Sequence, residues 1–138
     1  MTHKFDLRVY YEDTDSGGIV YYANYLKFAE RARTEMLRDL GVEHSAVLAR
    51  DGLAFAVRRC ATDYLSPAVL ADALTVLSTV TNMGGASFDM DQVVMRGDHK
   101  LAVLDVRMAC MQVRGDRTGK PARIPQDLRK VLTADAAA

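Results

Sequence analysis

A short acidic turn followed by two glycines is the part of this sequence whose residue types best support chemistry. Asp15 precedes Gly17 and Gly18, and Val20 leads into a stretch with helical spacing. The N-terminus of a helix offers unpaired backbone N–H groups and a partial positive charge, which stabilise a developing oxyanion. A carboxylate beside such donors activates water or attacks a carbonyl, and glycines let a ligand approach the backbone. This pattern suggests a hydrolase.

Asp13 and Asp15 also fit other interpretations. Two aspartates in a loop are commonly turn formers, whose side chains bond to nearby backbone. A calcium loop beginning at Asp13 lacks two ligands, because Gly17 and Asn24 occupy its fifth and twelfth positions. A phosphotransferase or haloacid-dehalogenase motif beginning at Asp13 needs Thr or Val where Gly17 stands. Turn formation and hydrolysis therefore remain as the two interpretations of this pair.

Other catalytic and metal-binding patterns do not fit the sequence. The string GGASF lacks the second glycine of a GxSxG nucleophile motif, so Ser87 is expected in a strand. The three histidines do not have metal-ligand spacing. Cys60 and Cys110 have no CxxC companion, and we expect two buried thiols rather than a disulfide or a metal site. The sequence therefore predicts neither a metal nor a cofactor.

The elements that position Asp15 follow from hydrophobic periodicity. Residues 5–11 alternate between apolar and polar side chains, which predicts a strand, and residues 12–18 form a turn by composition. From residue 22 to residue 40 apolar side chains recur at helical steps, so a long helix is expected there. The remaining expected elements are a short helical or irregular piece at 42–50, strands at 53–65, 73–82, 87–95 and 100–113, a helical turn at 126–132 and a frayed end at 133–138.

This order predicts an α+β fold in which one curved antiparallel sheet of about five strands wraps one long helix. No linker or repeat divides residues 1–138, so a single domain is expected. Lys plus Arg and Asp plus Glu number 18 each, which argues against the basic excess of nucleic-acid-binding proteins. No apolar run approaches the ~20 residues of a membrane span, and the N-terminus is too polar for a signal peptide, so we expect a cytoplasmic protein.

The segment RVYYEDTDSGGIVYYANYLKFAERARTEML strongly resembles the N-terminal half of the hotdog-fold acyl-CoA thioesterases of the Tol-Pal-associated subfamily. These enzymes are related to 4-hydroxybenzoyl-CoA thioesterase. The strings DYLSPAVLAD, GGASF and GKPARIPQDLR extend the resemblance over nearly the whole chain. The resemblance implies the hotdog fold and hydrolysis of a thioester to free CoA and a carboxylic acid, a reaction that needs no metal.

The resemblance also assigns roles by position. Asp15 matches the family's catalytic aspartate, which acts as general base or nucleophile. Tyr22 matches the residue whose backbone N–H polarises the thioester carbonyl, although many relatives carry His there. By analogy, residues of a second segment line the site. The implied substrate-binding residues are Gly17, Gly18, Val20, Gly85, Ala86 and Ser87.

An oligomer is implied as well, because the family pairs its sheets edge to edge in dimers, often assembled into homotetramers. The sites lie at the dimer interface. Acyl-CoA is the implied substrate, and acyl carrier protein is a second candidate partner. A non-catalytic module that binds acyl thioesters or acyl carrier protein is the alternative. Asp15 separates the two, because a binding module does not need a carboxylate against the thioester carbonyl. The acyl chain and the side chains that bind the CoA phosphates stay open.

Overall fold

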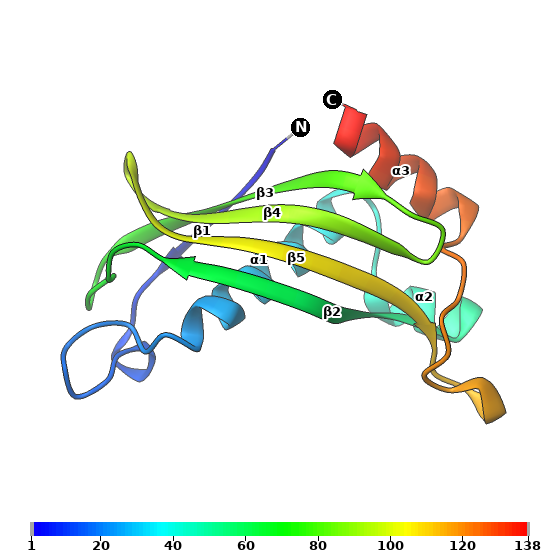
Figure 1. Cartoon of the computed structure of the whole chain (residues 1–138), viewed down its shortest axis with the longest axis horizontal. Coiled ribbons are helices and arrows are strands. Elements are labelled where there is room, and N and C mark those ends of the chain that lie inside the picture. Colours follow the sequence, from blue (N-terminus) through cyan, green and yellow to red (C-terminus); the bar gives the residue numbers. More distant parts are fainter. Residues whose placement is uncertain (1, 138) are drawn as a thin grey trace.

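The computed structural model of the chain describes residues 2–137, without the side chains of residue 44 and of residues 134–137. Its five-stranded antiparallel sheet has the strand order β1-β3-β4-β5-β2. The sheet curves around helix α1 (Asn24–Asp39), which lies against one of its faces (Figure 1). The predicted α+β fold is confirmed. The strands are β1 (His3–Arg8), β2 (Leu53–Tyr64), β3 (Ala73–Met83), β4 (Ser87–Arg96) and β5 (His99–Gln112).

Helix α1 buries the apolar stripe that its spacing predicts. Phe28, Ala29 and Ala32 are completely shielded from solvent. The small alanine side chains let the helix backbone approach the sheet closely, since the distance between packed elements depends on the side chains at the contact. The helix packs mainly against β1, β3 and β4. The edge strand β2 is less covered, so Val57 and Tyr64 are 47% and 46% exposed.

Most elements agree with the expected ranges, and two ends differ. Strand β1 ends at Arg8, before the expected residue 11, and the chain turns at Tyr11–Asp13 in a 3₁₀ turn (η1). Helix α3 (Gln126–Ala137) is longer than the expected helical turn at 126–132. The alanine-rich sequence favours this extension, because alanine has the highest helix propensity. The segment expected to fray is thus helical to Ala137, and its last residue, 138, lies outside the described residues.

The two cysteines differ in exposure. Cys110 on β5 is buried, as expected, and burial raises the pKa of its thiol. Cys60 on β2 is exposed, so the expectation of two buried thiols is wrong for Cys60. The physical reason is that β2 lies at the sheet edge, where α1 does not cover it.

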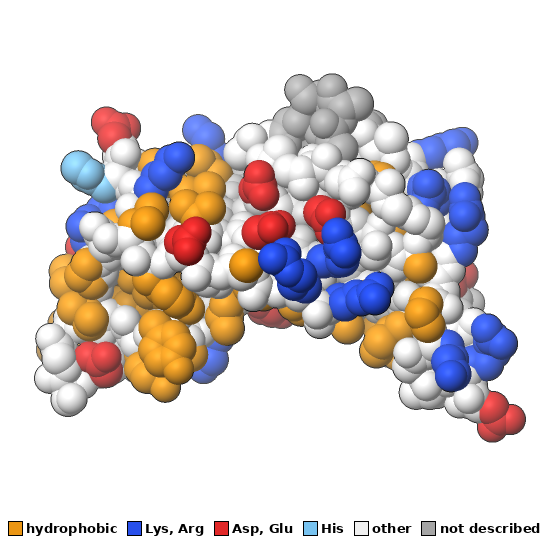
Figure 2. Space-filling model, viewed as in Figure 1, with side chains coloured by type: hydrophobic (Ala, Val, Ile, Leu, Met, Phe, Trp, Pro, Cys, Tyr) orange, Lys and Arg blue, Asp and Glu red, His pale blue; other side chains and the backbone are white. Residues whose placement is uncertain are grey.

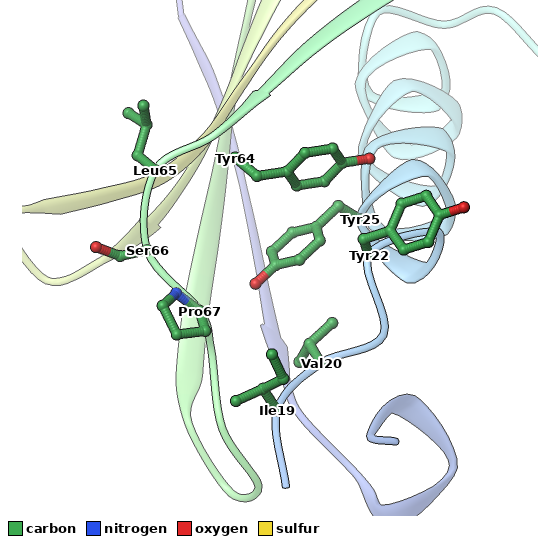
Figure 3. Close-up of a pocket in the computed structure, with 8 residues that line it drawn as sticks. All are labelled: Ile19, Val20, Tyr22, Tyr25, Tyr64, Leu65, Ser66 and Pro67. Atoms are coloured by element: carbon green, nitrogen blue, oxygen red, sulfur yellow. The ribbon is translucent and has the colours of Figure 1, made fainter. Parts of the chain in front are cut away.

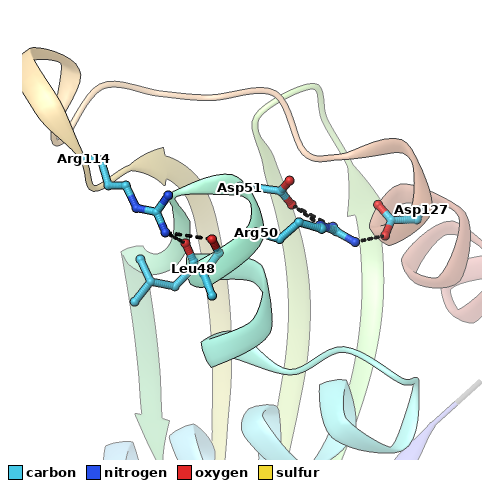
Figure 4. Close-up of polar contacts among 6 residues, drawn as sticks. Leu48, Arg50, Asp51, Arg114 and Asp127 are labelled. Atoms are coloured by element: carbon cyan, nitrogen blue, oxygen red, sulfur yellow. Dashed lines mark hydrogen bonds and ion pairs between the residues drawn. The ribbon is translucent and has the colours of Figure 1, made fainter.

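Polar contacts join helix α2 (His44–Asp51) to the C-terminal part of the chain (Figure 4). Arg114 donates to the carbonyl oxygens of Leu48 and Ala49, which lie in the last turn of α2. The Leu48 carbonyl also accepts the N–H of Gly52, the residue that ends this helix. Arg50 pairs with Asp127 of α3 at 3.0 Å. Helix α3 in turn packs on β3, so α2 and α3 close one end of the core. None of the helices between residues 2 and 137 has the length and apolarity that crossing a bilayer demands.

The packing of α1 predicts a large effect of Phe28→Ala on stability. Phe28 is 0% exposed and packs edge-to-face on Tyr25, so its removal leaves a cavity beneath the helix. We expect the free energy of unfolding to fall by about 3–5 kcal/mol. Leu26→Ala on the same helix is the control, because Leu26 is 42% exposed. Denaturant unfolding at one protein concentration measures both, and equal losses would contradict the described packing.

Candidate active site

The loop before α1 is a tight turn whose two arms pair with each other. Thr14 and Val20 form an isolated antiparallel bridge, and the Asp15 N–H donates to the Ile19 carbonyl at 2.9 Å. Gly18 has a φ of +80°, a left-handed conformation that glycine adopts without strain. Asp15 therefore lies at the tip of a turn that leads directly into the helix.

The Asp15 carboxylate is exposed, and in the described part of the chain one of its two oxygens accepts a hydrogen bond. Its Oδ1 accepts the Gly17 N–H at 2.8 Å, which makes an Asx-turn. A Cβ at residue 17 would lie 3.1 Å from this oxygen, so glycine suits the position. Within residues 2–137, Oδ2 of Asp15 has no hydrogen-bond partner. This second oxygen is open to water or to a ligand.

Asp13, in contrast, holds the loop together. Its side chain is 8% exposed, and Oδ2 accepts the Tyr10 N–H at 2.8 Å. Its carbonyl oxygen accepts the Tyr21 N–H at 2.9 Å and the side-chain amide of Asn24 at 2.8 Å. Asn24 is the first residue of α1 and is buried. Asp13 thus fixes the acidic turn to the start of the helix.

Helix α1 begins without a side-chain cap. Ala23 occupies the N-cap position, and its side chain has no polar atom with which to accept a hydrogen bond. In the described part of the chain, neither the Tyr22 N–H nor the Ala23 N–H has an acceptor. Both groups lie at the positive end of the helix dipole. They are therefore free donors in the place where a carbonyl oxygen or an oxyanion binds well.

A cavity of about 260 Å³ opens beside this end of the helix. The Tyr64 ring, from the end of β2, meets the ring of Tyr22 edge-on at 5.9 Å between centroids and that of Tyr25 at 5.6 Å. Partial burial raises the pKa of the Tyr64 hydroxyl above its usual value. These walls suit an apolar ligand group. The lining residues, shown in Figure 3, are Ile19, Val20, Tyr22, Tyr25, Tyr64, Leu65, Ser66 and Pro67.

The segment after β2 closes the other side of this cavity. The Ala68 N–H donates to the Tyr25 hydroxyl oxygen at 2.9 Å, and the Ala68 carbonyl accepts the Val20 N–H at 2.9 Å. Ile19 and Val69 form an isolated antiparallel bridge. The acidic loop, the start of α1 and the segment after β2 are therefore one connected unit.

The expected site residues fall into two separate groups. Tyr22 and Val20 line the first cavity, and the turn of Asp15, Gly17 and Gly18 precedes it outside the lining. The segment 85–87 lies elsewhere, where Ala86 and Ser87 line a second cavity of about 320 Å³ with residues 56–58 from the first half of β2. Extended chain rises about 3.3 Å per residue, so Arg58 and Tyr64 lie roughly 20 Å apart along β2.

The second cavity has a basic rim. Ala86 and Ser87 line it together with Arg58, which is the extra residue at the bulge of β2. Gly85 lies beside Arg123, since a Cβ at residue 85 would be 3.6 Å from the Arg123 Nη1. Figure 2 shows Lys and Arg side chains gathered at this end of the molecule and hydrophobic side chains at the end that carries the acidic loop.

Sequence reasoning did not identify Tyr64 as a site residue. The contact between Tyr64 and Tyr22 joins the end of β2 to the start of α1, and no local pattern reports such a pairing. The one signal was the position of Pro67, which marks the end of the strand just after Tyr64. Asn24 was missed for the same reason, because its partner Asp13 lies in another element.

Comparison with known proteins agrees with this architecture. The family model of the thioesterase-like superfamily matches residues 9–132. The acyl-CoA thioesterase YbgC of Haemophilus influenzae is 42% identical over 125 residues, which are 91% of this chain and 90% of that protein. A probable thioesterase from Bartonella henselae is 35% identical, and its crystal structure superposes with a TM-score of 0.83 over 91% of this chain and 100% of its own.

The fold itself is shared more widely. Slr0204, a 1,4-dihydroxy-2-naphthoyl-CoA thioesterase from Synechocystis, is 22% identical and superposes with a TM-score of 0.86 over 96% of each chain. The curved sheet around one long helix is thus the hotdog fold. The chain belongs to the thioesterase-like superfamily, within the family of the YbgC acyl-CoA thioesterases. The resemblance seen in the sequence is confirmed.

Asp72 supports the segment that carries Val69. Its Oδ2 accepts the Val69 N–H at 2.9 Å and pairs with Arg96 at 2.7 Å. The neighbouring Ala71 has a φ of +71°, an unfavourable conformation for a residue with a Cβ. Burial alone would raise the pKa of Asp72, but the Val69 N–H and the Arg96 guanidinium outweigh it and hold this pKa below its usual value.

These contacts predict the effect of Asp72→Asn on stability against pH. Because the folded-state pKa is lowered, the stabilisation is present above the unfolded pKa of about 3.9 and is lost as the pH falls through the folded value. We expect Asp72→Asn to lower the free energy of unfolding at neutral pH by about 1 kcal/mol after solvent screening, and to lose less stability on acidification. Thermal unfolding at several pH values measures this. Asp98→Asn in the exposed hairpin turn is the control, and an identical pH dependence in the two variants would contradict the assignment.

Proposed function

We propose that this chain is an acyl-CoA thioesterase, which hydrolyses a thioester to free CoA and a carboxylic acid. The observation that carries the proposal is the pair of free N–H donors at Tyr22 and Ala23, beside an apolar cavity and directly after the turn of Asp15. The name of the 42% identical relative, an acyl-CoA thioesterase, supports the same reaction. The reaction needs an oxyanion site and a carboxylate, and this unit contains both groups.

In the proposed mechanism, the thioester carbonyl oxygen accepts hydrogen bonds from the start of α1. Negative charge develops on this oxygen as the tetrahedral intermediate forms. Donors fixed in such a place are worth about 3 kcal/mol each in comparable sites. The Asp13 and Asn24 contacts hold the loop on the helix, so the donors do not have to reorganise during the reaction.

Asp15 is the proposed catalytic carboxylate. Its free Oδ2 either takes a proton from the water that attacks the carbonyl carbon, or attacks this carbon itself to form a mixed anhydride that water then hydrolyses. In both routes the C–S bond breaks and CoA leaves as the thiol after it takes up a proton. The Gly17 N–H holds the other oxygen and orients the carboxylate.

The Tyr22 side chain does not enter this mechanism, because the role of residue 22 uses its backbone N–H. Its ring is 61% exposed and packs on the rings of Tyr21 and Tyr64. A phenol therefore stands where many relatives carry an imidazole. The proposal assigns residue 22 a part of the cavity wall and an oxyanion donor, and no proton transfer.

A dimer would join the two groups of site residues. Strand β2 is 12 residues long and has one unpaired edge, which a copy of itself can cover. A two-fold pair of identical edge strands is antiparallel, so the Tyr64 end of one β2 lies near the Leu53 end of the other. The cavity at Tyr22 then faces the partner's Ala86 and the partner's Ser87. The complete site is proposed to lie at this interface.

The outer face of the sheet is proposed as the contact between two such dimers in a tetramer. It carries charged side chains of both signs across the middle of the sheet (Figure 2). Arg107 pairs with Asp89 at 2.7 Å and Arg59 with Asp105 at 3.1 Å. Each of these arginines is paired with an aspartate of its own chain. This face can therefore pack on another sheet without burying an unpaired charge.

The basic rim of the second cavity is the proposed site for the CoA phosphates. Arg58 lines this cavity and Arg123 lies next to Gly85. The planar guanidinium group binds phosphate oxygens through two parallel hydrogen bonds. An acyl-CoA would thus place its thioester at the Tyr22 end of one protomer and its nucleotide on the partner's Arg58.

Binding of an acyl thioester or of acyl carrier protein without turnover is the second candidate function. The Asx-turn at Asp15 favours it, because such turns form in many loops without a catalytic role. The two candidates differ in one measurable property, which is the release of a free thiol.

Asp15→Asn tests the proposed reaction. The asparagine keeps an oxygen for the Gly17 N–H but cannot accept a proton, so we expect kcat/KM to fall a hundredfold or more. Thiol release from short, long and aromatic acyl-CoAs measures it, and Glu12→Gln in the same loop is the control. Turnover that survives the substitution would overturn the role of Asp15. A protein that binds acyl-CoA but never releases thiol would favour the binding function.

Arg58→Ala tests the proposed phosphate site. Loss of the guanidinium is expected to raise KM for acyl-CoA about tenfold and to leave kcat unchanged, because the group does not touch the thioester. Hydrolysis of the matching acyl-pantetheine, which lacks the nucleotide, should not change. The control is Arg59→Ala, whose side chain pairs with Asp105 on the outer face. Equal effects on acyl-CoA and acyl-pantetheine would contradict the assignment.

A further inference from the structure

A charged side chain is buried beneath α1, outside both cavities described above. Arg33 is 8% exposed, and its Nη1 donates to the Gln92 Oε1 at 2.9 Å. Gln92 is completely buried, and its amide nitrogen donates to the Ala29 carbonyl at 2.9 Å and to the Ser78 hydroxyl oxygen at 2.9 Å. These two bonds fix the Gln92 amide so that its oxygen faces the guanidinium. The network holds Arg33 in one orientation.

The positive charge of Arg33 has no counter-ion within the chain as described. None of the ion pairs among the described side chains includes Arg33. Glu30, one turn earlier on the helix, acts on it only through space, and burial lowers the pKa of Arg33. A buried charge is strongly unfavourable unless an opposite charge and hydrogen bonds compensate it. One neutral amide oxygen is a weak partner for a guanidinium with five N–H donors.

Arg33 also borders a cavity that reaches the edge strand β2. The cavity has a volume of about 160 Å³ and lies between α1 and the strands β2, β4 and β5, with Glu30 from the helix and Val57 from β2 in its lining. Val57 is an apolar side chain that is 47% exposed at the rim of this cavity. The cavity therefore opens at the edge strand, next to the middle of β2.

We propose that a second copy of this chain closes this cavity, and that Glu30 of each protomer pairs with the partner's Arg33. The inference rests on the proposed dimer through β2 and is independent of the role of Asp15. Residues close to a two-fold axis lie close to their own counterparts. The axis of a β2 pair centred on the strand passes its middle, so two Arg33 guanidiniums approach each other. The two exposed Glu30 carboxylates on the same rim are the matching negative charges.

The pair sets the register of the dimer. Backbone bonds alone allow two edge strands to pair in several registers, each shifted by two residues. Only a register that brings Glu30 to the partner's Arg33 compensates both buried cations, and every other one leaves them unpaired. The register also decides whether the Tyr22 cavity meets the partner's Ser87. Arg33 and Glu30 are thus positioning residues for the composite site.

A mixing experiment separates a pair between protomers from a pair within one. Glu30→Gln and Arg33→Met proteins are purified separately, one with ¹⁵N label, then mixed and equilibrated. Each homodimer has lost both pairs. The heterodimer keeps one pair, between the intact Arg33 of the first chain and the intact Glu30 of the second. Native mass spectrometry measures the fraction of heterodimer.

We expect the heterodimer to exceed the statistical half of all dimers. A tenfold preference raises its share to about nine-tenths. If the two residues pair within one chain, the heterodimer has no intact pair and its share stays at one half, which overturns the inference. Mixing Glu30→Gln with Arg31→Met is the control and should give one half, because Arg31 is exposed on the same helix. If Arg33→Met does not fold, Arg33→Gln replaces it.

The other outcomes are equally distinct. A protein that dimerises and hydrolyses acyl-CoA but mixes to one half overturns the ion pair and leaves the thioesterase proposal intact. A chain that stays monomeric overturns the dimer and this inference together. A third outcome is a heterodimer share of one half together with an Arg33→Met protein that alone loses activity on acyl-CoAs ending in a carboxylate. This result would identify a substrate anion as the partner of Arg33 and overturn the inference.

Discussion

The packing of helix α1 against the sheet is the constraint on which the rest of this structure depends. Phe28, Ala29 and Ala32 are shielded completely, so the helix cannot shift without exposing apolar surface or opening a void. Its first residue, Asn24, is tied to the acidic loop, and Tyr25 is tied to the segment after β2. The N–H groups at the start of the helix are therefore held in place by the hydrophobic core, and the proposed oxyanion site depends on this rigidity.

The same packing leaves the edge strand β2 partly uncovered. Helix α1 covers β1, β3 and β4, and the concave side of β2 remains partly open. Apolar, aromatic and charged groups meet at this opening, as the exposures of Val57 and Tyr64 show. A globular core normally does not leave an edge strand of this length uncovered. The open side, the separation of the two cavities and the uncompensated Arg33 all concern the same strand.

Local pattern was enough for the elements and for part of the site. The period of α1 and the alternation of the strands are visible because each element buries one face, and the turn chemistry of Asp15 and Gly18 marked the loop. Position in the sheet is not local. The exposure of Cys60, the contact of Tyr64 with Tyr22 and the burial of Arg33 depend on which strand lies at the edge and which strands the helix covers. No periodicity of the sequence carries this information.

The strand order also sets a sequence of events during synthesis. Among the described strands, β2 pairs with β5 alone. Leu53 can therefore pair with Gln112 only after the strands between them have left the ribosome. Until then the β2 segment has no neighbour on either side, whereas β3, β4 and β5 pair in the order in which they are made. Contacts between distant parts of a chain close slowly, because the loop between them must be ordered. The strand that completes the sheet is thus the last to form its backbone hydrogen bonds, although it is the second strand to be translated.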